Sequence, residues 1–159
     1  MTFIDYINVI HELSNKEIGI LFPYNLEIYS SNTFKLNYNI NVINHNPYNT
    51  LIDFKELKYK EIVIWNSLFI FIYKKSNNGY ELIQTIDENE QETNKNNKRR
   101  IKEHYYRLNS IYQLKNGILV SCNSYGLKFY KKEKNEYILE SKYNTEYDAK
   151  NIIEIKEKF

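Results

Sequence analysis

The stretch from Leu114 to Tyr130, LKNGILVSCNSYGLKFY, carries the pattern that predicts the fold, because two other segments repeat its layout. The same spacing separates a leucine from a tyrosine in Leu13–Tyr29 and in Leu57–Tyr73. Each of these segments, which we call the repeat motif, follows an apolar-polar lead-in and has an apolar residue just before its tyrosine. One repeat of this size cannot bury its own apolar faces, so it must pack on neighbouring repeats. The sequence therefore predicts an array of similar units.

Four strand-like pieces accompany each copy of the motif, and they are rich in Ile, Val, Phe and Tyr. They cover 9–13, 17–22, 25–29 and 34–40 in the first copy, 52–57, 61–65, 68–73 and 80–86 in the second, and 110–114, 118–122, 127–130 and 137–141 in the third. Asn116-Gly117 is a hairpin signal, so we expect the first two strands of each unit to form a tight hairpin. Residues 77–79 and 133–135 indicate a looser connection before the last strand.

The repeats divide the chain, which we take as a single repeat domain over residues 1–159. The units lie at about 8–48, 49–86 and 109–147, and a partial fourth unit at 151–159 places Ile155 where the motif has its leucine. Residues 87–103 contain one apolar side chain, Ile101, and are expected to form a polar surface insert.

The third copy resembles a blade of a WD40-type β-propeller. In that family a hairpin, a turn of small residues and an apolar-x-apolar-Trp strand follow one another, and here Tyr130 stands at the tryptophan position. Units of about 40 to 45 residues with four strands each are typical of propeller blades. The resemblance implies an all-β, propeller-like array of about three blades plus the first strand of a fourth. It also implies a scaffold that binds other proteins.

A β-trefoil is the alternative fold, because it also places three four-stranded repeats in about 150 residues. That fold would favour a carbohydrate-binding or other ligand-binding module. A propeller ring needs at least four blades, so the three units of a propeller segment would belong to a longer ring or self-associate to complete one.

The composition limits which compartment and which classes of partner we expect. The 22 basic and 20 acidic side chains leave a net charge of +2, which gives little field to attract nucleic acid or a membrane. The single cysteine, Cys122, excludes an internal disulfide framework and is expected to be a small core residue. Residues 1–5 have no basic flank typical of a signal peptide, and the longest apolar run, 68–73, is too short for a membrane helix. We therefore expect a cytoplasmic protein.

No residue pattern indicates catalysis, a cofactor or a metal, so we assign no catalytic, cofactor-binding or metal-binding residue. His11, His45 and His104 lie far apart in the sequence, and His11 is expected to point outward from its strand. The glycines are isolated, which excludes a phosphate-binding loop. Three glutamates recur at one repeat position and are expected to form a rim or an outward row rather than an acid-base pair: Glu12, Glu56 and Glu154.

A run of basic residues and the motif tyrosines are both interpreted as structural features. The basic run from Lys95 to Lys102 follows an acidic run from Asp87 to Glu92, so neighbouring charges neutralise its field and a solvated loop is expected. The motif tyrosines, Tyr29, Tyr73 and Tyr130, are expected to be core or interblade packing residues rather than stacking platforms for bases. The sequence thus predicts a noncatalytic protein-interaction scaffold, which is not an enzyme, whose partner is another protein.

Overall fold

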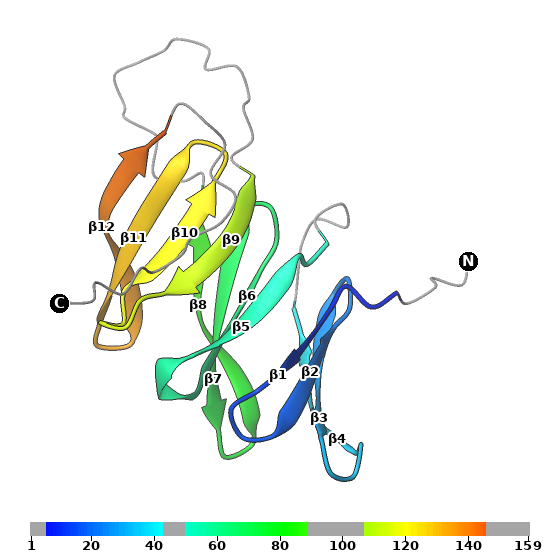
Figure 1. Cartoon of the computed structure of the whole chain (residues 1–159). Coiled ribbons are helices and arrows are strands. Elements are labelled where there is room, and N and C mark those ends of the chain that lie inside the picture. The colour runs from blue at the N-terminus through cyan, green and yellow to red at the C-terminus, as the bar shows by residue number, and fades with distance from the viewer. Residues whose placement is uncertain (1–5, 43–49, 89–106, 146–159) are drawn as a thin grey trace, which may run out of the picture. The chain divides into compact units, whose positions relative to one another are not determined.

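The structure is a computed structural model, and it describes residues 6–42, 50–88 and 107–145 (Figure 1). These residues form an all-β fold of three four-stranded antiparallel sheets. Within them no helix is long and apolar enough to cross a bilayer.

Each sheet comes from one copy of the repeat. The first contains β1 (Val9–Glu12), β2 (Glu17–Leu21), β3 (Asn25–Ser30) and β4 (Leu36–Asn41). The second contains β5 (Asp53–Leu57), β6 (Glu61–Trp65), β7 (Phe69–Ser76) and β8 (Gly79–Asp87), with the short 3-10 turn η1 (Lys58–Lys60) between β5 and β6. The third contains β9 (Leu108–Gln113), β10 (Leu119–Asn123), β11 (Gly126–Glu133) and β12 (Glu136–Asn144). The twelve predicted strands are confirmed, with ends shifted by a few residues.

The strands of every sheet pair in sequence order, as antiparallel neighbours. No described strand of one sheet pairs with a strand of another, and the described strands close no barrel. A trefoil needs strands of different repeats to pair around a shared barrel. The described sheets therefore do not match the trefoil alternative.

The tyrosine that ends each repeat motif marks an irregularity in strand pairing. The register between the third and fourth strands shifts between Ile28 and Tyr29, and it shifts at the equivalent place before Tyr73 and before Tyr130. One extra residue lies on the fourth strand at each shift, which is the arrangement of a β-bulge. A leucine faces the tyrosine across the bulge in every sheet, namely Leu36, Leu82 and Leu139.

The first hairpin of each sheet also repeats in its backbone. The third residue after the motif leucine has a positive φ in every copy: 61° at Lys16, 60° at Lys60 and 91° at Gly117. A positive φ costs least at glycine, so only the third copy shows the turn as an Asn-Gly signal. The lysines at the same position adopt the same conformation without that signal.

The last hairpins of the second and third sheets are tighter than the sequence suggested. Ser76 pairs with Gly79 and Glu133 with Glu136, so two residues close each turn. The expectation of a looser connection was therefore wrong. The run of polar residues there is the tip of a long two-stranded ribbon, because β7, β8, β11 and β12 extend beyond the bulge.

The chain divides into two compact units, 1–87 and 88–159. The first unit holds two sheets and the second holds one. The expectation of a single repeat domain stays a prediction.

Asp87 and Glu88 differ from the predicted polar surface insert, because Asp87 ends β8 and Glu88 is completely buried. Residues 89–103 and the predicted fourth unit at 151–159 lie outside the described residues, as do His45, His104, Lys95–Lys102 and the N-terminal five residues.

One apolar core joins the two sheets of the first unit. The first sheet contributes Leu13, Leu21, Leu26, Ile28, Ile40 and Val42, and the second contributes Leu51, Phe54, Ile62, Ile64, Phe71 and Tyr73. All are at most 6% exposed. Alternation explains this packing, since every second residue of β2 is buried and its neighbours are only half-buried.

Candidate functional site

The contact between the two sheets of the first unit shows how one repeat recognises the next. Its tightest point is Gly19 on β2, which lies against the ring of Phe54 on β5. A Cβ atom at residue 19 would be 2.5 Å from Cζ of Phe54, closer than real Cβ atoms approach other atoms. The missing side chain of Gly19 therefore makes the space that the Phe54 ring fills.

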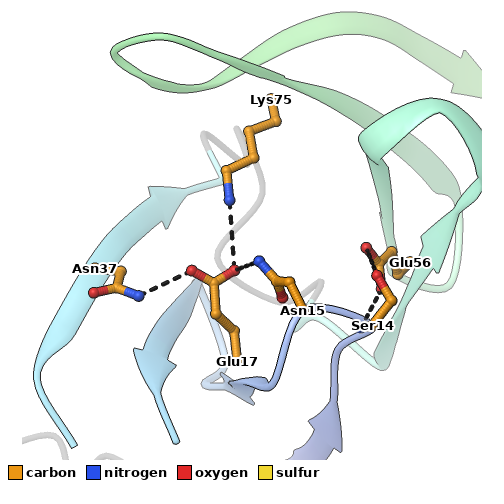
Figure 2. A network of polar contacts seen from close by, with 6 residues as sticks. All are labelled: Ser14, Asn15, Glu17, Asn37, Glu56 and Lys75. Atoms are coloured by element: carbon orange, nitrogen blue, oxygen red, sulfur yellow. Dashed lines mark hydrogen bonds and ion pairs between the residues drawn. The ribbon is translucent and has the colours of Figure 1, made fainter. Parts of the chain in front are cut away.

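Polar contacts surround this core, and Glu17 is the centre of one group (Figure 2). Its carboxylate accepts hydrogen bonds from Asn37 Nδ2 at 2.9 Å and from Asn15 Nδ2 at 2.5 Å. The Lys75 ammonium, from the second sheet, lies 3.5 Å from the same carboxylate. Glu17 is 8% exposed, so these partners offset the cost of burying its charge.

Lys75 also contacts two aromatic rings that belong to different sheets. Its Nζ lies 4.7 Å from the ring centroid of Tyr38 and 5.6 Å from that of Tyr80. The two rings meet edge to face with centroids 5.4 Å apart. Burial raises the pKa of the Tyr80 phenol, and the negative charges of Glu17 and Glu56 raise it further. The lysine thus joins the two sheets through a carboxylate and two ring faces.

Two more polar pairs cross between the sheets. Ser14 donates from its backbone N–H and its hydroxyl to the two carboxylate oxygens of Glu56, at 2.7 and 2.8 Å (Figure 2). His11 Nε2 lies 2.9 Å from Oδ1 of Asp53. The expectation that His11 points outward was therefore wrong, because its ring faces the neighbouring sheet and packs on Phe54 at 5.1 Å between centroids.

A second group of polar side chains is buried in the other unit, and no sequence pattern had indicated it. Glu88 accepts a hydrogen bond from the Tyr130 hydroxyl at 2.9 Å and lies 3.0 Å from Nζ of Lys128. Asn123 Nδ2 donates to the same carboxylate at 3.3 Å, and Lys128 also donates to the backbone carbonyl of Glu88. All four residues are at most 5% exposed. Burial raises the pKa of the Tyr130 phenol, and the Glu88 charge raises it further.

This buried group has the composition of a structural ion pair. The carboxylate is matched by one ammonium, and its remaining acceptor capacity is used by a phenol and an amide. General acid-base chemistry needs two titratable groups whose surroundings separate their roles, together with access for substrate.

No group of three or more His, Cys, Asp or Glu residues suited to a metal occurs in the described part of the chain.

The other predicted residues take mainly structural places. Cys122 is fully buried, as expected. Glu12 and Glu56 are exposed, and Glu56 lies at the rim of the contact between the two sheets of the first unit, where it binds Ser14. Glu154 lies outside the described residues. Tyr73 and Tyr130 are buried, and burial raises the pKa of Tyr73 to about 12. Tyr29 is only half-buried.

An apolar surface remains open on the far side of the first sheet. Strand pairing places six side chains on this outer face: Ile10, Glu12, Ile18, Ile20, Glu27 and Tyr29. Ile10 is 56% exposed, and Ile18 and Ile20 are only half-buried. Tyr29 donates a hydrogen bond to Glu27, which raises the pKa of the phenol. No described element of the same unit packs on this face, so we take it as the candidate interaction site.

Comparison with known proteins adds information on the fold. No family model matches the sequence, and no curated protein matches it. Among solved structures the chain is similar to the extracellular domain of a putative hybrid two-component system from B. thetaiotaomicron, with a TM-score of 0.56 and 18% sequence identity. The match covers 92% of this chain and 18% of the other chain. At this identity the likeness concerns the fold alone, and the chain spans less than a fifth of the larger structure.

Proposed function

We propose that this chain is a noncatalytic, β-propeller-type scaffold that binds other proteins. The observation that carries the proposal is the repeated packing unit. Three copies of one motif form three four-stranded meanders, and the first two meanders stack through an apolar core with a polar rim. Meanders of this kind, stacked face to face around an axis, are the blades of a propeller.

The first sheet gives this scaffold a binding surface. Its outer face exposes Ile10 and half-exposes Ile18 and Ile20, next to the carboxylates of Glu12 and Glu27. Apolar surface with a polar border is the usual composition of a protein-protein contact.

Affinity capture tests the proposal. The tagged full chain is used as bait in lysate, and the untagged full chain is added as competitor. A protein retained near one-to-one stoichiometry and released by the competitor supports the scaffold function. A bait that retains no protein specifically, while the purified chain converts a small molecule or binds a glycan array, would overturn it.

The compartment is a separate prediction. The chain has a single cysteine, Cys122, so it can form no internal disulfide and needs no oxidising environment, and we propose a cytoplasmic location. Fractionation of the source cells, followed by detection with an antibody to the chain, tests this. Recovery from the outside of the cell would contradict it.

A further inference from the structure

The second and third sheets each bind one side chain from the segment that follows the preceding sheet. We call it the plug residue, and it is the sixth residue after the leucine that faces the motif tyrosine across the bulge. After the first sheet it is Val42, which is 4% exposed and shares the apolar core with Phe71 of the second sheet. After the second sheet it is Glu88, which is 0% exposed and binds Lys128 and Tyr130 of the third sheet.

The plug residue matches the chemistry of one motif position in the sheet that it meets. This position lies two residues before the motif tyrosine, and it holds Phe71 in the second sheet and Lys128 in the third. Apolar Val42 shares a core with Phe71, and the carboxylate of Glu88 lies 3.0 Å from Nζ of Lys128. Packing stabilises the first pair and opposite charge stabilises the second, so both pairs are complementary.

The first sheet holds a carboxylate at the same position, on its outer face. Glu27 stands where the other sheets have Phe71 and Lys128, and it is half-buried. It accepts hydrogen bonds from the Tyr29 hydroxyl and from Asn25 Nδ2, the latter at 3.4 Å. No basic side chain in the described part of the chain forms an ion pair with Glu27. The outer face therefore carries a charge that a partner can neutralise.

The first and third sheets arrange the same groups with the charges reversed. In both sheets the motif tyrosine donates a hydrogen bond to a carboxylate, from Tyr29 to Glu27 and from Tyr130 to Glu88. In the third sheet the plug residue supplies the carboxylate and the sheet supplies the ammonium of Lys128. In the first sheet the carboxylate belongs to the sheet itself, so a complementary plug residue has to supply the ammonium.

The rest of the outer face is suited to a sheet of the same type. Three isoleucines of this face hold motif positions that are in the apolar core in the second sheet, namely Ile10, Ile18 and Ile20. Ile10 is 56% exposed, although its counterpart Phe54 is 0% exposed. Glu12 holds the position of Glu56, whose carboxylate accepts two hydrogen bonds from Ser14 of the neighbouring sheet. An occupant of the same type would cover the isoleucines and offer donors to Glu12.

We propose that the outer face of the first sheet binds a four-stranded sheet of another protein, whose plug residue is a lysine that pairs with Glu27. A second copy of this chain does not supply that lysine, because the plug residue after its third sheet is the uncharged Thr145. The backbone places Thr145 like Val42, since the N–H of each donates to the carbonyl of the equivalent tyrosine, Tyr125 or Tyr24. The inference rests on the proposed scaffold function and names the kind of partner.

Zero-length cross-linking tests the proposal, because a carbodiimide joins a carboxylate directly to an amine that touches it. The tagged full chain is incubated with lysate, treated with the carbodiimide and purified, and its cross-linked peptides are identified by mass spectrometry. We expect a cross-link from Glu27 to a lysine of another protein. Glu27→Gln should remove it, whereas Glu81→Gln, an exposed change on β8, should leave it in place.

Charge reversal then measures the contribution of this pair with the purified partner. Glu27→Lys should weaken binding by about tenfold or more, and changing the cross-linked lysine of the partner to glutamate should restore it. Glu81→Lys is the matched control and should leave the affinity unchanged. Circular dichroism of each variant checks that the sheets remain folded.

The possible results separate this inference from the scaffold function. A specifically captured protein that forms no cross-link with Glu27, or whose binding survives Glu27→Lys, overturns the inference and leaves the scaffold function in place. A cross-link from Glu27 to a second copy of this chain also overturns it, because the partner would not be another protein. A bait that retains no protein specifically overturns both.

Discussion

The second and third sheets use one face of the repeat in opposite ways. In the second sheet this face consists of Ile62, Ile64, Phe71 and Tyr73, all in the apolar core of the first unit. In the third sheet the same motif positions hold Leu119, Ser121, Lys128 and Tyr130, and the last two bind the buried Glu88. The strand order and the bulge are nevertheless the same in both sheets.

This difference shows that the fold of a repeat does not depend on the chemistry of one face. Backbone pairing, turn conformation and the bulge define the sheet, whereas the buried face needs only to be complementary to what it meets. An apolar face achieves this through close packing, and the third sheet achieves it through an ion pair with its hydrogen-bond partners.

Loss of the ammonium that pairs with the buried Glu88 should have the largest effect on stability. Lys128→Met should lower the free energy of unfolding by about 3–5 kcal/mol, because it leaves the Glu88 carboxylate buried without its counter-charge. Urea unfolding monitored by circular dichroism measures this change. Lys131→Met, an exposed change on the same strand, should cost less than about 0.5 kcal/mol.

A double variant separates the contribution of charge from that of packing at the same site. Combining Lys128→Met with Glu88→Gln removes both charges, and it should recover part of the loss, since the uncompensated charge is the main cost. A double variant as unstable as Lys128→Met alone would show that packing, not charge, determines the stability of this site.

The apolar arrangement is tested at its closest contact. Gly19→Ala should lower the free energy of unfolding by about 1–3 kcal/mol, because the new Cβ would overlap the Phe54 ring. In the Phe54→Leu background the same substitution should cost less, since the smaller side chain leaves room. Equal costs in the two backgrounds, measured in a double-mutant cycle, would contradict the contact.

The buried phenols predict a loss of stability at alkaline pH. Burial raises the pKa of Tyr73 to about 12, whereas the phenol ionises near 10 when unfolded. Its contribution is therefore fully present below pH 10 and is lost as the pH rises from 10 towards 12, by roughly 1.4 kcal/mol per pH unit. Unfolding midpoints between pH 9 and 11.5 measure this, and Tyr73→Phe should flatten part of the slope.

Loss of one hydrogen bond between Ser14 and Glu56, at the rim of the apolar core, should have the smallest effect on stability. Ser14→Ala removes one of the two hydrogen bonds to Glu56 but keeps the backbone donor, so it should cost about 0.5–1 kcal/mol. Ser31→Ala, which is outside this pair, is the control for the general effect of serine removal near the turn. A loss above about 2 kcal/mol for Ser14→Ala would mean that the rim contributes more than its exposure suggests.

The sequence predicted the strands well because strand alternation and motif spacing are local signals. The bulge was not predicted, although the apolar-tyrosine pair marks its position, because one unpaired residue leaves no distinct composition. Glu88 was missed for a different reason. It stands in an acidic run that looks solvated, and its partners Asn123, Lys128 and Tyr130 follow 35 to 42 residues later.

Contacts between repeats were also beyond the sequence. His11 occupies the strand position of Lys55 and Tyr112, which favoured an outward orientation. Its pairing with Asp53 depends on how the first strand of one sheet approaches the first strand of the next. The recurring glutamates were predicted as a row, yet only the structure shows that Glu56 binds Ser14.

The position of the bulge has a practical consequence for engineering this scaffold. Every turn between the third and fourth strands lies beyond the bulge, and it is five residues long in the first sheet but two in the others. The pairing behind the bulge is the same in all three sheets, so changes of length at the tip do not alter it. These tips, at 31–35, 77–78 and 134–135, are therefore the places to graft a peptide epitope or a fluorophore tag without disturbing the sheet.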